Sequence, residues 1–169
     1  MAKAAKKANS KRASKKAAKP AVRAVSKVTG AGMFKAKTAK EITATFIDRM
    51  GLTAKVASAL AAENVNILAG TGYSASGMRR RATFTLIVDD LAKAVRALEK
   101  IGADDFHESS VIMVEMANKV GALEKISKLI ANAGINIYYF YATTSSGKTA
   151  TCVIKTADDA KTIKVLHDA

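Results

Sequence analysis

Residues 111–137 read VIMVEMANKVGALEKISKLIANAGINI, and this stretch contains the pattern that decides the fold. An apolar run of strand length, 111–116, leads into a loop that contains Gly121. The apolar positions of the following segment are Leu123, Ile126 and Ile130. Their spacing of three and four residues is typical of an amphipathic helix. Gly134 stands where a left-handed helix stop is expected, and a second apolar run follows it. The stretch therefore predicts a strand, a helix and a strand in succession.

The same unit occurs twice in the chain, because a shift of about 70 residues superposes one copy on the other without a gap. The identical pairs include Gly51 with Gly121, Lys55 with Lys125, Ala61 with Ala131, Asn66-Ile67 with Asn136-Ile137, Ser76-Gly77 with Ser146-Gly147, and Val95 with Val165. We therefore divide the chain into a tail and linker, 1–40, a first module, 41–110, and a second module, 111–169.

Each module is predicted to run strand, helix, strand, strand, helix. The predicted strands are 42–47, 65–73, 81–88, 111–116, 135–144 and 149–156, and the predicted helices are 53–63, 90–101, 122–133 and 158–167. This order predicts an α+β fold of two ferredoxin-like βαββαβ modules, each an antiparallel sheet with helices on one face. Residues 106–109 can supply a fourth strand to the first module, whereas the second is expected to lack its last strand. Such a bare edge predicts a homodimer, or cover by residues near Val22 to Val28.

The net charge of +14 belongs to the start of the chain. Residues 1–40 carry 13 Lys or Arg and no acidic residue, which leaves 15 basic and 14 acidic residues for 41–169. We expect this Lys- and Ala-rich tail to be disordered and to be the only part of the chain that attracts nucleic acid. Deleting 1–40 should then leave the melting temperature of the remaining protein nearly unchanged.

Several function classes are disfavoured by composition. The single Cys152 excludes an internal disulfide and a multi-cysteine metal site, so we expect a reducing, cytoplasmic location. No apolar run approaches the roughly 18 residues of a membrane span, and no secretory signal is visible. His107 and His167 fall at different positions of the repeat, without a triad or metal-site pattern. We therefore expect neither catalysis nor a cofactor or metal.

The loop after the first strand of each module combines a short polar residue with Gly just before a helix. These residues are Asp48 and Gly51 in the first module, and Asn118 and Gly121 in the second. A helix N-terminus offers unpaired N–H groups and a positive dipole end, which together suit a carboxylate. The alternative is structural: Asp48 and Asn118 cap their helices locally, and the glycines relieve the turn.

The second module resembles the ACT domain. The resemblance rests on the strand 111–116, the loop Asn118-Lys119-Val120-Gly121-Ala122-Leu123 and the run Ala133-Gly134-Ile135-Asn136-Ile137. The first module matches more weakly, through Asp48-Arg49-Met50-Gly51 and Glu63-Asn64-Val65-Asn66-Ile67. Together the two modules resemble stand-alone tandem ACT proteins over about residues 41–168.

This resemblance implies regulatory, non-catalytic binding of an amino acid where ACT modules meet. The ligand-binding residues that it implies are Asp48, Met50, Gly51, Leu52, Asn66 and Ile67 in the first module, and Asn118, Val120, Gly121, Ala122, Leu123, Asn136 and Ile137 in the second. Family loops usually place Pro before the Gly, whereas this chain has Met50 and Val120 there. Because Asp48 would repel a carboxylate, we expect the second loop to be the better carboxylate site.

Two other functions stay open. The ACT pair of aspartokinase is also similar in outline, so the chain could be a detached regulatory module of an amino-acid biosynthetic enzyme. Alternatively, the basic tail makes it a nucleic-acid-associated protein. The globular part itself lacks the aromatic third-strand pattern of an RNA-recognition motif.

Overall fold

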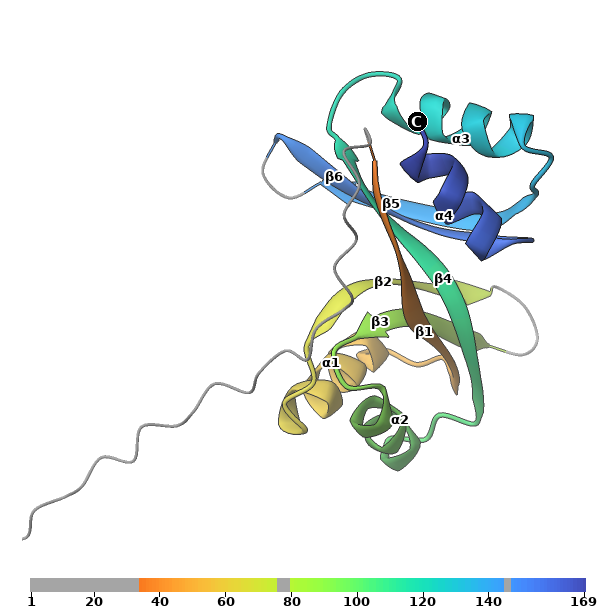
Figure 1. Cartoon of the computed structure of the whole chain (residues 1–169). Helices are drawn as coiled ribbons and strands as arrows, with labels where there is room; N and C mark the ends of the chain where they lie inside the picture. Colours follow the sequence, from red (N-terminus) through yellow and green to blue (C-terminus); the bar gives the residue numbers. More distant parts are fainter. Residues whose placement is uncertain (1–33, 76–79, 145–146) are drawn as a thin grey trace, which may run out of the picture.

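A computed structural model of the chain describes residues 34–75, 80–144 and 147–169 (Figure 1). In chain order its elements are β1 (Lys35–Ile47), α1 (Leu52–Ala62), β2 (Ile67–Ala75), β3 (Arg81–Val88), α2 (Leu91–Lys100), β4 (Asp105–Ala117), α3 (Ala122–Asn132), β5 (Ile137–Thr144), β6 (Thr149–Thr156) and α4 (Asp159–His167). The α+β fold, with an antiparallel sheet and helices, is as predicted. The proposed turn Ser76-Gly77 and the first residue of Ser146-Gly147 lie outside the described residues.

One antiparallel sheet runs through both modules, with the strand order β2-β3-β1-β4-β6-β5. The two central strands, β1 and β4, are each 13 residues long and serve both modules. The second half of β1 pairs with β3 and with the first half of β4, as in the pairs Ile42 with Leu86 and Ile42 with Glu108. The second half of β4 pairs with β6, as in Ile112 with Ile154.

The first half of β1 supplies the strand that the second module was expected to lack. Residues 35–40 pair with 110–115 of β4, for example Lys35 with Glu115. The first strand therefore begins well before Glu41, where we expected periodic structure to start. Sequence reasoning missed it because Lys35 and Lys37 are exposed while Ala36 is buried, so that the strand shares the Lys and Ala composition of the tail. Residues 22–28, our proposed cover, lie outside the described residues.

Two hydrophobic cores lie beneath the helices. α1 and α2 pack with Ile42, Ala44 and Phe46 of β1, whereas α3 and α4 pack with Phe34, Ala36 and the second half of β4. Figure 1 shows α1 and α2 at one end of the molecule, α3 and α4 at the other, and the strands between them. Both halves of the sheet therefore carry their helices on the outside.

The helix-free faces of the two halves pack against each other. Ile87, Val111 and Val153 form a third buried cluster, against which Ala69 of β2 and Tyr141 of β5 also pack. β2 and β5 are the opposite edges of the sheet, so the sheet must bend back on itself to bring them to one cluster. The layers thus run helices, half-sheet, half-sheet, helices. None of the helices in the described residues is long and apolar enough to cross a membrane.

Candidate functional site

The two Gly-bearing loops have matching backbone geometry. Gly51 (φ 81°) and Gly121 (φ 82°) are the N-cap residues of α1 and α3, and both have left-handed backbone that favours glycine. Neither helix has a side-chain cap, so the local-cap alternative for Asp48 and Asn118 does not hold. The Leu52 and Ala122 N–H groups donate to the Arg49 and Lys119 carbonyls (3.2 Å each), so the next N–H groups of each first turn are left to bind a ligand or water.

The polar residues of the loops bind the neighbouring hairpins instead. The Ser74 hydroxyl donates to the Asp48 carboxylate (2.5 Å), and the Asn118 amide donates to the Gly147 carbonyl (3.2 Å). The Asp48 N–H also donates to the Arg80 carbonyl (2.8 Å). These bonds hold each loop against the end of its own β-hairpin, and they leave the Asp48 carboxylate at the start of α1.

A hollow of about 510 Å³ opens between α1 and β2 in the first module. Its polar lining includes Asp48, Arg49, Thr53 and Ser74, and its apolar lining includes Leu52, Val56, Ile67, Ala82, Phe84 and Leu86. Because Gly70 and Gly72 have no side chains, Leu86 and Phe84 lie directly against the β2 backbone at this hollow. A Cβ on Gly70 would lie 2.6 Å from Leu86 Cδ2, and one on Gly72 would lie 3.1 Å from the Phe84 ring. The hollow thus has an apolar floor beside the helix N-terminus.

In the described part of the second module, the hollow at the loop is lined differently. The positions that match Gly70 and Gly72 in the repeat are Phe140 and Ala142, which carry side chains. A hollow of about 400 Å³ lies at the second loop, but its lining is 116–124 with Ala150 and includes no residue of β5. The two loops are alike in backbone, but among the described residues the hollow at the first loop reaches its neighbouring strand, β2, and the hollow at the second does not reach β5.

The structure brings together some of the residues that sequence analysis selected. At the first loop Asp48, Gly51, Leu52 and Ile67 line one hollow, whereas Met50 is fully exposed and does not line it. At the second loop Asn118, Val120, Gly121, Ala122 and Leu123 line the smaller hollow, without Ile137.

The two asparagines of the repeated Asn-Ile pair, Asn66 and Asn136, line neither of these two hollows. The Asn66 N–H donates to the Asp89 carboxylate (2.8 Å), and the Asn136 carbonyl accepts from the Ala157 N–H (2.9 Å). Both bonds lie at the start of a strand, β2 or β5. From the rise along a strand, that end is roughly 20 Å from the Gly-bearing loop. Both bonds use main-chain atoms, so they do not explain why asparagine recurs at this position. Gly70, Gly72 and Ser74, which shape the hollow, were not selected, although Gly within a strand signals close approach or an open face.

A buried carboxyl group joins the two modules. Glu41 of β1 is 0% exposed, and it accepts hydrogen bonds from the hydroxyls of Tyr139 and of Tyr141 (2.9 Å for the latter). Burial, and then the neighbouring Glu41, raise the pKa of both tyrosines, so both hydroxyls keep their protons and donate. Tyr139 and Tyr141 thus cover a sheet face and bind Glu41.

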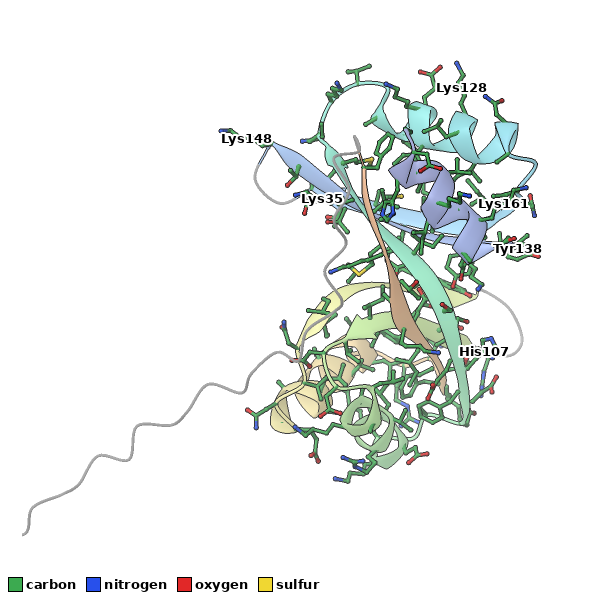
Figure 2. The ribbon with its side chains drawn as sticks, in the orientation of Figure 1. Lys35, His107, Lys128, Tyr138, Lys148 and Lys161 are labelled. Carbon is green, nitrogen blue, oxygen red and sulfur yellow. The ribbon has the colours of Figure 1, made fainter. Side chains whose placement is uncertain are left out.

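No constellation typical of catalysis is visible in the described part of the chain, which also holds no group of three or more His, Cys, Asp or Glu that could bind a metal. Cys152 is buried in the second core, and burial raises the pKa of its thiol to about 11. His107 lies exposed on β4 (Figure 2). His167 is hydrogen-bonded to the Ala36 carbonyl (3.0 Å). The described residues therefore offer no activated nucleophile.

Several solved structures have a fold similar to that of this chain. A protein from Bacteroides thetaiotaomicron is 27% identical, with a TM-score of 0.68 over 79% of this chain and 89% of that one. The ligand-free regulatory subunit of aspartate kinase from Thermus thermophilus is 20% identical, with a TM-score of 0.60 over 84% of this chain and 97% of that one. The corresponding subunit from Thermus flavus is 22% identical, with a TM-score of 0.56 over 83% and 97%. Neither the comparison with protein-family models nor that with curated proteins found a match. The likeness to the aspartate kinase subunits establishes a shared fold.

Proposed function

We propose that this chain, which has the ACT fold, is a non-catalytic regulatory protein that binds an amino acid in the hollow between α1 and β2. The observation that carries the proposal is the open apolar floor beside the uncapped N-terminus of α1, with the Asp48 carboxylate at the same end. An amino acid has the three matching parts: a carboxylate, an ammonium group and a side chain.

Each part of the ligand has a partner of suitable chemistry. The free N–H groups at the start of α1 suit the carboxylate, and Arg49 adds a positive charge to the same lining. Asp48 suits the ammonium group, so the negative charge that made this loop look unfavourable for a carboxylate becomes useful. Phe84 and Leu86 lie beneath Gly72 and Gly70 and offer an apolar surface to an aliphatic side chain. We therefore favour the first loop over the second.

The regulatory part of the proposal rests on the fold and on the position of the hollow. The similar structures include regulatory subunits of aspartate kinase, which supports action on an amino-acid biosynthetic enzyme. The hollow lies along β2, an edge strand of the sheet, where a second copy of the chain could pair and close it. In this proposal the ligand binds at such an interface in a cytoplasmic homodimer, and binding changes how the dimer assembles.

Asp48→Asn is expected to weaken amino-acid binding by roughly 10- to 100-fold, because a hydrogen bond to a charged group contributes about 1.5–3 kcal/mol. Isothermal calorimetry with the tightest-binding of the twenty amino acids measures this change. The matched variant in the other module is Asn118→Ala, which should leave the affinity nearly unchanged.

Gly121→Val separates the two loops further, because a Cβ there obstructs only the second hollow. If Gly121→Val or Asn118→Ala weakens binding while Asp48→Asn does not, the second loop is the site and our assignment is wrong.

A further inference from the structure

A second cavity, of about 240 Å³, lies between the helix-free faces of the two half-sheets, apart from the hollow that faces α1. Its lining residues are Leu68, Ala69 and Gly70 of β2, Met113 of β4, Tyr141 and Thr143 of β5, and Thr149, Thr151 and Val153 of β6. Val153 is buried at 1% exposure, whereas Leu68, Thr143 and Thr149 are exposed. The cavity therefore has a buried floor and a mouth at the surface.

The cavity exists because the two modules fill their shared interface unequally. In the 70-residue repeat, Ala69 and Gly70 correspond to Tyr139 and Phe140. Tyr139 extends from β5 and binds Glu41, which fills the interface on that side. Ala69 has only a methyl group where Tyr139 has a ring, so the matching space beside β2 stays open. The small residue at position 69 thus leaves the cavity.

The chemistry of the lining is uncharged. Among the residues that the structure describes, no Asp, Glu, Lys, Arg or His lines the cavity, and the Tyr141 hydroxyl is already bound to Glu41. Met113, Val153 and Ala69 give it an apolar floor. Thr143, Thr149 and Thr151 bring hydroxyl groups, and in the described residues the hydroxyls of Thr143 and Thr151 have no protein partner.

We propose that this inter-module cavity is a second ligand site, which takes a small uncharged molecule with an aliphatic part and one hydrogen-bonding group. A charged molecule would lose its hydration without gaining a counter-charge. An apolar protein cavity of about 150 Å³ is known to hold benzene, so this larger one accommodates a molecule of that size together with a polar group. The aliphatic part lies against Val153 and Met113, and the polar group meets the threonine hydroxyls.

This site is distinct from the amino-acid site, although the two share one residue. Gly70 lines both the hollow that faces α1 and the inter-module cavity. Only the β2 backbone separates the two spaces there, and Tyr141 connects the cavity to Glu41 and so to β1. The site therefore stands whether or not the first hollow binds an amino acid.

Methyl NMR of the full chain tests the proposal with 1-butanol as the probe. We expect the Met113 and Val153 methyl signals to shift saturably, with a dissociation constant in roughly the millimolar range, as suits so small a ligand. Butyrate and butylammonium have the same aliphatic chain with a charge at its end, and we expect them to shift these signals at least tenfold less at equal concentration.

Two variants give the site its control. Thr149→Phe places a ring at the exposed mouth and should abolish the saturable shift, whereas Thr144→Val removes a hydroxyl from the same hairpin outside the cavity and should preserve it. Unshifted methyl signals in the wild-type protein would overturn the proposal. So would an equal response to butyrate, or an unchanged response in Thr149→Phe.

Discussion

Removing residues 1–40 is expected to lower the melting temperature by roughly 10–15 °C, whereas removing 1–33 should change it by no more than about 2 °C. The longer deletion takes away the strand 35–40, which pairs with β4, and the buried side chains of Phe34 and Ala36. Loss of a buried Phe alone costs about 3–5 kcal/mol. The shorter deletion leaves every described contact in place. Calorimetric melting of both truncated proteins measures the difference.

This result would reverse our expectation from sequence that all of 1–40 is dispensable for stability. A pair of point variants tests the same strand without truncation. Ala36→Asp buries a carboxylate at a side chain that is 1% exposed, whereas Lys37→Asp changes an exposed neighbour. If the melting temperature of Ala36→Asp lies within about 2 °C of that of Lys37→Asp, then 35–40 does not form the fourth strand of the second module.

The double variant Tyr139→Phe, Tyr141→Phe is expected to lower the free energy of unfolding by about 3–5 kcal/mol. It removes both side-chain donors from Glu41, which is fully buried, and leaves the carboxyl group without them. Because the tyrosines belong to the second module and Glu41 lies on β1, the loss should affect the packing of one module on the other. Urea unfolding followed by circular dichroism measures it.

A rescue distinguishes this hydrogen-bonding role from simple loss of packing. Adding Glu41→Leu to the double Phe variant removes the buried carboxyl group that the donors served, so most of the lost stability should return. If the triple variant is no more stable than the double one, the tyrosine hydroxyls do not act through Glu41.

Sequence reasoning was most successful where periodicity and repetition are strong. The repeat gave the order of strands and helices, and the predicted strands 81–88 and 149–156 have the observed bounds. Asn64 and Gly134 have the positive φ angles expected at helix stops. The resemblance to the ACT domain is confirmed at the level of the fold.

Sequence reasoning failed where a feature depends on which module a segment joins. Nothing local to 35–40 indicates that it pairs with β4, since that pairing is between residues about 75 positions apart. Glu41 was not selected from the sequence, and only the packed half-sheets show it buried beside two tyrosines. Gly70 and Gly72 drew no prediction either, and their closeness to Leu86 and Phe84 is visible only in the structure. Each of these features is set by tertiary contacts that periodicity does not encode.

A thermal-shift screen of the full chain against the twenty amino acids tests the central claim most directly. A ligand that binds only the folded state at 100 times its dissociation constant adds about 2.7 kcal/mol of stability. For a chain of this size that corresponds to a rise in melting temperature of roughly 5–10 °C. We predict such a rise for one amino acid, or a few of related side chain, and its loss in Asp48→Asn. Unchanged melting temperatures with all twenty amino acids at 10 mM or so would contradict the proposal that the chain is an amino-acid sensor.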